Sequence, residues 1–186
     1  MNKVLIGMML MISSMFAGTV ITSIGIGKET VIKPRAISVD LVQAQLAYRF
    51  NNGIVTGVSI IDGIPDVGTR QTRIEINLGY TTKVGSLLPY IIAGKGNLEV
   101  GPKDYDYVVV MTGCNVMVAP DLSVSVQHRY RKDDDMNWKT NRYQLGAGYK
   151  LNKTISVVIG YGKSYGTLGG STYESIQQSI GIDYKF

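Results

Sequence analysis

The last twelve residues of the chain, 175–186, read "SIQQSIGIDYKF" and alternate between apolar and polar side chains. Ile180, Ile182, Tyr184 and Phe186 fall on one face of an extended strand, while small or polar residues fall on the other. Chain ends usually fray into polar tails, so a regular strand that finishes on an aromatic residue needs a partner on each edge. We therefore predict that this strand closes a sheet by pairing with the first strand.

The same period-two alternation recurs along the chain in segments of about ten residues separated by turn signals, as in transmembrane barrels. Nine such segments cover residues 38–50, 54–61, 72–80, 88–96, 106–118, 122–132, 142–151, 154–165 and 171–186. A single-chain bacterial barrel has an even number of strands, so parity predicts a tenth strand within residues 19–33. The predicted fold is all-β, an antiparallel up-and-down transmembrane barrel of ten strands. Eight strands are the alternative if the first hairpin folds differently.

Turn signals predict the orientation of the barrel. Short turns are expected at residues 51–53, where Asn-Gly favours a hairpin, and at 119–121 and 152–153. They alternate with longer polar loops around Pro65, Pro102, Asp134 and Gly169. Short turns on the periplasmic side and long loops outside are typical of outer membrane barrels.

The first residues have the layout of a secretory signal peptide, with Lys3 followed by an uncharged apolar run and then small residues. We predict a signal peptide over residues 1–17, cleaved after Ala17, with cleavage after Ser23 or Gly25 as alternatives. The barrel then comprises residues 18–186, integral to the outer membrane of a Gram-negative bacterium. An uncleaved membrane anchor is the rival interpretation, because the apolar run is long enough to span a bilayer.

Composition narrows the classes of function. Only 18% of residues are charged, and Gly (22) and Tyr (12) are abundant, which suits curved strands and wet aromatic positions. The net charge is +5, but the Lys and Arg residues are scattered through strands, so nucleic acid is not a predicted partner. With one cysteine, Cys114, and one histidine, neither a disulfide nor a His/Cys metal site is expected, and no cofactor is predicted.

The inward-facing side chains form the candidate site. By alternation they include seven charged residues, Arg49, Arg73, Glu75, Arg129, Arg131, Arg142 and Lys150. Small barrels fill their interiors with side chains, so we predict that Glu75 pairs with one or more of the arginines in a plug of salt bridges and hydrogen bonds. The basic excess predicts that any residual path prefers anions.

Two other polar groups are weaker candidates. His128 lies three residues from Ser125, and residues three apart point to opposite faces of a strand, so this pair cannot form a catalytic site. His128 is expected on the lipid face near the outer interface. The acidic run 133–135 is interpreted as a solvated loop, with a divalent-cation or lipopolysaccharide contact as the alternative.

Four segments carry a resemblance to a known family. "AYRFNNG" (47–53), "LPYIIAGKG" (88–96), "NRYQLGAGYKL" (141–151) and the terminal "GIDYKF" (181–186) resemble the strand motifs of small outer membrane barrels of the OmpA and OmpX type. The resemblance covers roughly residues 38–186 and implies that the closing strand, with Ile180, Ile182, Tyr184 and Phe186, is recognised by the barrel-assembly machinery. An apparent extra hairpin departs from the eight-stranded family pattern.

These observations predict a non-enzymatic outer membrane barrel with a side-chain-filled lumen. We expect it to act at the cell surface, in membrane integrity, adhesion or surface interaction through its loops. Expected partners are outer membrane lipids and lipopolysaccharide, the barrel-assembly machinery, and host or phage surface ligands. A narrow porin-like pore for small anionic solutes is the alternative function.

Overall fold

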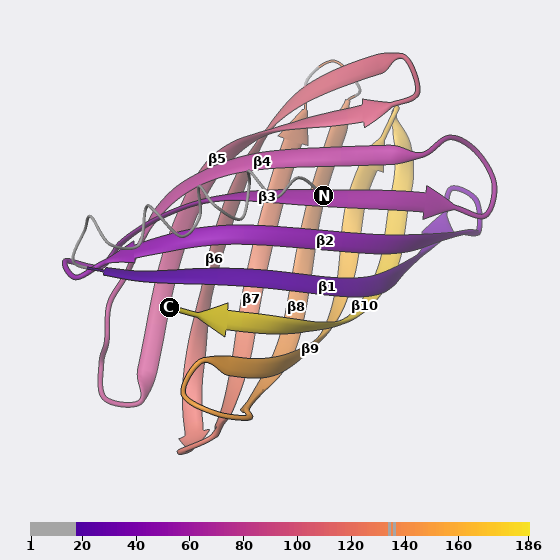
Figure 1. Ribbon diagram of the computed structural model, residues 1–186. Coiled ribbons are helices and arrows are strands. Elements are labelled where there is room, and N and C mark those ends of the chain that lie inside the picture. Colours follow the sequence, from indigo (N-terminus) through magenta and orange to yellow (C-terminus); the bar gives the residue numbers. More distant parts are fainter. Residues whose placement is uncertain (1–17, 134, 136) are drawn as a thin grey trace.

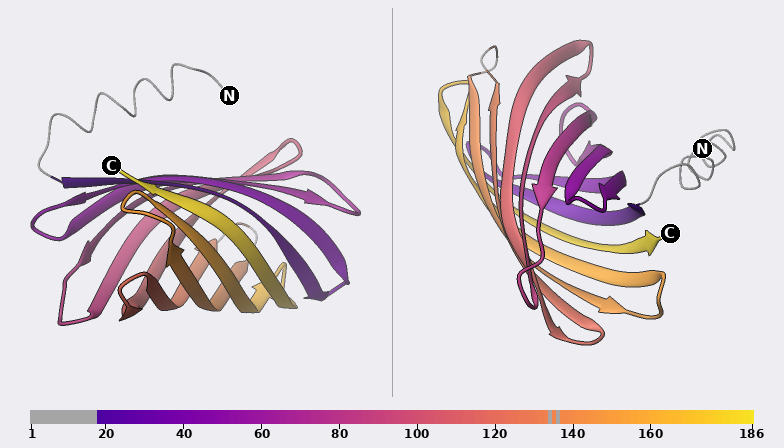
Figure 2. Two further views of the ribbon diagram at one scale, coloured as in Figure 1. Left: turned by 60° about the horizontal axis from the view of Figure 1, so that its bottom comes forward. Right: turned by 90° about the vertical axis from the view of Figure 1, so that its left-hand side faces the viewer.

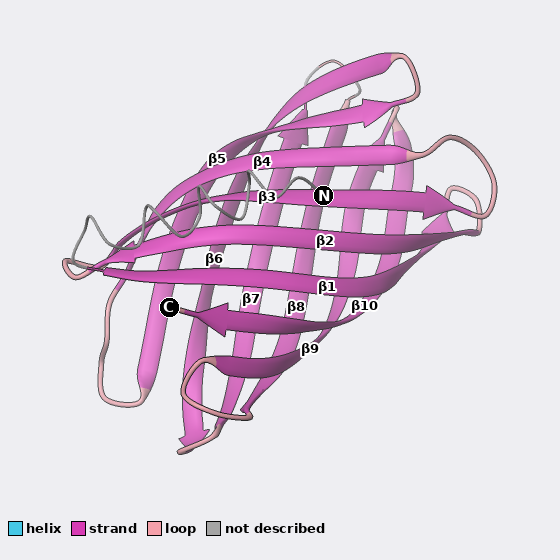
Figure 3. Ribbon diagram, viewed as in Figure 1, coloured by secondary structure: helices cyan, strands magenta, loops and turns pink. Residues whose placement is uncertain are grey.

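The computed structural model describes residues 18–133, 135 and 137–186, and these form ten strands (Figures 1 and 3). The strands are β1 (Gly18–Lys33), β2 (Ile37–Phe50), β3 (Ile54–Pro65), β4 (Gln71–Thr81), β5 (Leu87–Val100), β6 (Lys103–Ala119), β7 (Leu122–Asp133), β8 (Trp138–Lys150), β9 (Ile155–Leu168) and β10 (Ser171–Lys185). Each strand pairs antiparallel with its neighbours in sequence, and β1 pairs with β10, so the sheet is a closed barrel (Figure 2). No helix in the described part of the chain is long and apolar enough to cross a membrane.

The strand predicted from parity is β1, which closes the barrel. Ile24 lies opposite Ile182 of β10 on one side and Ala44 of β2 on the other. The terminal strand is therefore paired on both edges, as its regular alternation predicted, and even the Phe186 amide donates to the Val20 carbonyl at 3.0 Å. The ten-strand prediction is confirmed and the eight-strand alternative is wrong. Closure leaves no open sheet edge, which a bilayer would not tolerate.

The alternation places apolar side chains on the outside of the barrel. Ile24, Ile26, Ile76, Leu78 and Leu145 are among the most exposed residues of the described chain. A soluble monomer rarely exposes so large a contiguous apolar surface, whereas the hydrocarbon core of a bilayer requires one. The alternate residues at the end of the chain, Ile180, Ile182, Tyr184 and Phe186, all lie on this face. The outer surface is therefore suited to contact with lipid tails.

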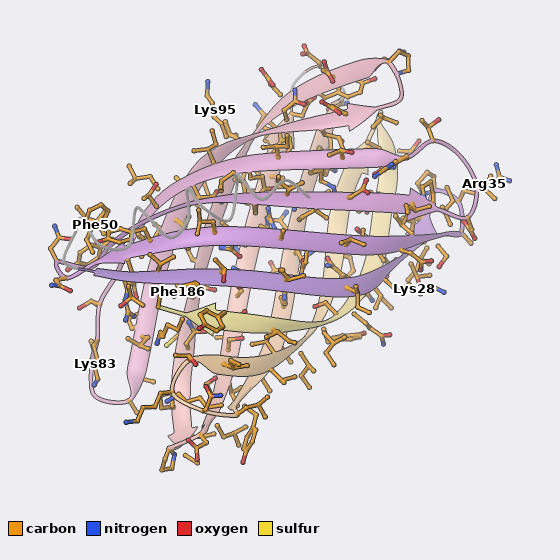
Figure 4. All side chains as sticks on the ribbon, in the orientation of Figure 1. Lys28, Arg35, Phe50, Lys83, Lys95 and Phe186 are labelled. Atoms are coloured by element: carbon orange, nitrogen blue, oxygen red, sulfur yellow. The ribbon has the colours of Figure 1, made fainter. Side chains whose placement is uncertain are left out.

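An aromatic group and a charged belt border this apolar surface. At the end where β1 begins and β10 ends, Tyr48 packs edge-on against Phe50 and Tyr184 packs against Phe186, with centroid distances of 4.5 and 4.4 Å. Figure 4 shows Phe50 and Phe186 at this end and Arg35 at the other. Toward the opposite end, the outer positions of several strands become charged: Lys28, Asp40, Asp62, Lys95, Lys132 and Lys163. The change marks the second membrane interface.

The turns are short at both ends, so the prediction of longer outer loops is wrong. At the predicted outer end, β5 is joined to β6 by residues 101–102 alone, and β9 to β10 by residues 169–170 alone. At the other end, where β1 begins and β10 ends, β4 is joined to β5 by the longer segment 82–86. The segment 97–105, predicted as the loop around Pro102, forms the end of β5, a two-residue turn and the start of β6. Its inward side chains Leu98 and Val100 still pack in the lumen, and this packing keeps the chain in strand beyond the apolar band.

The predicted signal peptide, residues 1–17, lies outside the described residues. The apolar run of the rival uncleaved anchor continues to Gly27, and its residues 18–27 lie in β1. The alternative cleavage positions after Ser23 and Gly25 fall inside β1, where both residues pair with β2 and β10.

Candidate functional site

One of the buried carboxylates in the lumen is Glu29 of β1, which is only 2% exposed. Its Oε1 accepts hydrogen bonds from Tyr173 Oη at 2.8 Å and from Ser175 Oγ at 2.7 Å, both on β10. Arg142 Nη2 lies 3.1 Å from Oε1, and Arg73 Nη2 lies 3.4 Å from Oε2. Charged hydrogen-bonded pairs of this kind offset the cost of removing a carboxylate from water. We refer to these five residues as the Glu29 cluster.

Arg142 ties the Glu29 cluster to two further strands. Its Nε donates to Ser164 Oγ of β9 at 2.8 Å, and its Nη1 donates to Gln177 Oε1 of β10. Each nitrogen of the guanidinium therefore has a partner, which fixes the side chain in one geometry. The cluster joins side chains from β1, β4, β8, β9 and β10 across the interior.

Another buried carboxylate is Glu75 of β4, which is 1% exposed. Tyr107 Oη of β6 donates to Oε1 at 2.6 Å, Arg129 of β7 donates to Oε2, and Arg131 Nη2 lies 3.4 Å from Oε1. These four residues form the Glu75 cluster. It adjoins the Glu29 cluster, because Arg129 and Arg142 are direct cross-strand neighbours. Together the two clusters carry four guanidinium groups and two carboxylates.

Arg131 is the least well satisfied member of the two clusters. Its side chain is buried, yet its Nε and Nη2 make no hydrogen bond. Its guanidinium instead lies 5.8 Å from the Tyr107 ring centroid and 5.7 Å from that of Trp138, within the range of cation–π attraction. The positive charge of Arg131 is therefore stabilised by the faces of these two rings and by a single carboxylate oxygen, Glu75 Oε1.

The half of the lumen that contains the Glu29 and Glu75 clusters is called the outer half below, after the predicted orientation. Apolar side chains fill the rest of this half. One cluster contains Leu98, Tyr107, Val109, Met111 and Trp138, and a smaller one contains Val39, Leu41 and Ile61. Trp138 is the first residue of β8, and Val39 lies opposite Pro65, the last residue of β3. Both apolar clusters therefore extend toward the end opposite to the one where β1 begins and β10 ends. Ion pairs and apolar packing together close this half of the barrel.

The other half of the lumen, at the end where β1 begins and β10 ends, is open, and we call it the periplasmic half after the predicted orientation. A cavity of about 420 Å³ is lined by amide side chains such as Gln43, Gln127 and Gln144, and it ends at Glu75 and Arg129. A second cavity of about 530 Å³ shares Arg49, Thr81 and Leu88 with the first. Its lining carries four cations, Arg49, Lys83, Lys150 and Lys185, and no acidic side chain among the described residues. This half is hollow and basic.

The seven residues predicted for the lumen divide between these two halves. Five of them, Arg73, Glu75, Arg129, Arg131 and Arg142, lie in the two clusters, although Arg73 and Arg142 pair with Glu29 rather than Glu75. Arg49 and Lys150 lie at the periplasmic mouth, where Lys150 Nζ donates to the Pro120 carbonyl at 3.1 Å.

Sequence reasoning missed Glu29, Tyr107, Tyr173 and Ser175. Glu29 lies on the inward face of β1 with Ser23, Gly25 and Gly27, and this alternation was present in the segment assigned only by parity. The sequence indicates a lumen position less clearly for Tyr107 and Tyr173, because tyrosine also occurs on the lipid face.

The remaining candidates lie elsewhere. His128 is on the outer face, with Nε2 3.1 Å from Asn141 Oδ1 and its ring 4.9 Å from that of Tyr143. Asp133 is the last residue of β7 and only 3% exposed, so interpreting it as part of a solvated loop was wrong: the inward face of the strand continues to this residue. Within the described ranges, no three His, Cys, Asp or Glu side chains gather closely enough to hold a metal ion.

Comparisons with solved structures agree with this architecture. The β domain of the Bordetella autotransporter BrkA matches with a TM-score of 0.53 and 9% identity over 90% of this chain and 99% of that domain. The KdgM porin in complex with disordered oligogalacturonate gives 0.50 and 16%, over 88% of this chain and 99% of the porin. The anion-selective porin from Comamonas acidovorans gives 0.47 and 14%, over 81% of this chain, which spans only 55% of that porin.

No family model and no curated protein matches the sequence. At these identities the comparisons establish the fold alone. The protein is a closed ten-stranded antiparallel barrel with the fold of outer membrane β-barrels.

Proposed function

We propose that the protein is a non-conducting, non-enzymatic barrel in the outer membrane of a Gram-negative bacterium, where it contributes to membrane integrity and surface contacts. The observation that carries this proposal is the pair of adjoining Glu29 and Glu75 clusters. Together with Ser164 of β9, to which Arg142 donates, they link seven of the ten strands across the lumen, and apolar side chains of β2, β3 and β5 occupy the remaining sector. A lumen filled in this way leaves no continuous water path through the outer half.

The surface role differs from the one predicted from the sequence. Outer connections of two to five residues are too short to form large binding loops. All the strands except β4 contain 12 to 17 residues, more than the roughly 9–11 needed to span a bilayer, so hairpin ends project beyond the charged belt. We propose that any adhesive contact, or contact with a phage, is made by the sides of these hairpins.

Membership of the OmpA and OmpX type and recognition by the barrel-assembly machinery are further parts of the proposal. The support is the outward row Ile180, Ile182, Tyr184 and Phe186 on a strand that pairs with β1 to complete the barrel. A terminal strand of this kind is available for recognition before closure.

A narrow anion-preferring pore is the second candidate function. The observation that favours it is the basic cavity at the periplasmic mouth, where Arg49, Lys150 and Lys185 converge without an acidic partner in its lining. Such a mouth would concentrate anions. For conduction, the Glu29 and Glu75 clusters would have to rearrange.

Single-channel recording in planar bilayers tests both candidates. A plugged barrel is expected to show no steady conductance, and only rare small openings. A steady conductance of the unmodified protein would contradict the proposal, and its reversal potential in a salt gradient would show whether anions are preferred. Glu75→Gln is the informative variant, because it removes the charge that holds Arg129 and Arg131. If this variant matches the unmodified protein in both stability and conductance, the plug is not what closes the lumen.

A further inference from the structure

A shallow groove of about 550 Å³ lies on the outer face of the barrel across β6 to β9. Its deeper apolar wall is a cross-strand row made of Val126, Leu145 and Tyr161. On the β6 side its lining includes the small side chain of Thr112, which lies opposite His128, and the backbone of Gly113. The groove therefore lies among lipid-facing residues, outside the lumen.

The next row toward the outer end is aromatic and polar. It consists of His128, Tyr143 and Lys163, which are direct cross-strand neighbours. The His128 ring stacks at a tilt on Tyr143, and His128 Nε2 is 3.1 Å from Asn141 Oδ1, so this row is held in place by its own contacts. Polar groups so ordered on a lipid-facing surface match the height of lipid headgroups.

Beyond this row the surface becomes cationic. Lys132 of β7 and Lys139 of β8 are cross-strand partners at the outer end of the same face. Lys163 Nζ lies 2.9 Å from Glu174 Oε1, and Lys33 Nζ lies 3.8 Å from Glu174 Oε2. Glu174 therefore pairs with two of the four lysines on this side of the barrel, Lys33 and Lys163, whereas Lys132 and Lys139 lie beside the turn that carries Asp135.

The opposite side of the same belt has the reverse charge. Outer-facing residues of β2 to β6 at this end include five carboxylates, Asp40, Asp62, Glu99, Asp104 and Asp106. Among the outward positions of these strands only Lys95 opposes them, and Arg70, in the turn before β4, donates to Asp62. The basic sector is therefore a local feature and does not follow from the net charge of the chain.

We propose that the groove and the lysines beyond it form a binding site for one phosphorylated glycolipid of the outer leaflet. An acyl chain lies against Val126 and Leu145, the sugar contacts the His128 and Tyr143 row, and the phosphate is held by Lys132 and Lys139. The order of apolar, aromatic and cationic rows along β7 and β8 matches the order of tail, sugar and phosphate in such a lipid. The inference rests on the outer membrane orientation proposed above.

The site is tested by native mass spectrometry of the folded full-length barrel in detergent, titrated with bis-phosphorylated lipid A. We expect a saturable one-to-one adduct. The triple variant Lys132→Gln, Lys139→Gln and Lys163→Gln should bind on the order of 100-fold more weakly. The reason is that each surface lysine strengthens the binding of an anionic headgroup by a factor of about five. A matched control that also loses three cations, Arg70→Gln, Lys95→Gln and Lys103→Gln, should bind as the unmodified protein does.

A second variant separates the groove from the charge. Thr112→Phe places an apolar ring in the groove and keeps all the lysines, and it should weaken the adduct without changing the barrel. Dephosphorylated lipid A should bind the unmodified protein about as weakly as the phosphorylated lipid binds the triple lysine variant.

Three results would overturn the proposal. They are equal loss of binding in the lysine triple and its matched control, no effect of Thr112→Phe, and equal binding of phosphatidylglycerol, which would indicate general attraction to anionic lipid. Heat-dependent gel mobility, recorded on each variant, shows whether the barrel is folded. A protein found outside the outer membrane refutes the proposed location, whereas lost lipid specificity in a correctly located barrel refutes only this site.

Discussion

The outer and periplasmic halves of the lumen are both lined with polar side chains, but only the outer half pairs its charges. There Glu29 contacts Arg73 and Arg142 and accepts hydrogen bonds from Tyr173 and Ser175. In the periplasmic half, Asp183 bonds Ser23 while the cations at the mouth face an open cavity. The comparison teaches that polarity of the inward residues does not decide whether a small barrel is closed. In the outer half, charge pairing across strands acts together with apolar packing.

The largest expected effect follows from removing the charge of Glu29. Glu29→Gln keeps the shape of the side chain but leaves Arg73 and Arg142 buried without a counter-charge, which is expected to cost about 3–5 kcal/mol of unfolding free energy. Urea unfolding in lipid vesicles, followed by tryptophan fluorescence, measures this. Glu174→Gln on the exposed outer face is the control and should change stability little. Equal stability of the two variants would mean that the outer half is not held by paired charge.

The two arginines Arg142 and Arg131 sharpen the comparison within the outer half. Arg142→Met removes three nitrogens that make hydrogen bonds and takes away one of the two arginines that pair with Glu29. It should therefore destabilise the barrel by roughly as much as Glu29→Gln. Arg131→Met removes a buried guanidinium that lacks hydrogen bonds at two nitrogens, and Glu75 keeps Arg129. Its cost should be about 1 kcal/mol or less, since a hydrophobic side chain can replace a poorly satisfied buried charge. A cost for Arg131→Met that equals the cost for Arg142→Met would contradict the ranking.

The periplasmic half should respond in a different observable. The triple variant Arg49→Gln, Lys150→Gln and Lys185→Gln removes cations that face a cavity, so the unfolding free energy should change by about 0.5 kcal/mol or less. Any residual openings in bilayers should lose their preference for anions, as judged by the reversal potential in a potassium chloride gradient. A marked loss of stability would show that these cations are structurally paired after all.

The smallest effect on the folded barrel is expected at the last residue. Phe186→Ala removes a ring that packs on Tyr184 but keeps the hydrogen bond from its amide to Val20. The stability of the folded barrel should barely change, whereas the amount assembled in the outer membrane should fall if the terminal aromatic is part of the assembly signal. Quantifying the heat-modifiable form in isolated membranes measures this. Phe50→Ala, which loses a comparable ring at the same end, is the matched control and should assemble normally.

Alternation along each strand was enough to predict the strand number, the closure and the inward position of five charged residues in the clusters. It could not predict which charges pair, because the partners lie far apart in sequence. Glu29 bonds Arg142 and Tyr173, on β8 and β10, and that choice depends on strand register and barrel curvature. Glu29 itself was missed because the outward face of β1 turns from Ile26 to Lys28, which ends the apolar signal of the strand early. The outer hairpins were missed for the same reason.

The brevity of the turns bears on how the protein would be recognised by an immune system. Loop tips are where proteolysis and tolerance of insertion concentrate, and here Gly169 and Gly170 alone join β9 to β10. Antibodies against linear loop peptides would find almost no matching segment on the folded barrel. Antigenicity would belong to the paired sides of the projecting hairpins, so only a folded immunogen would display it.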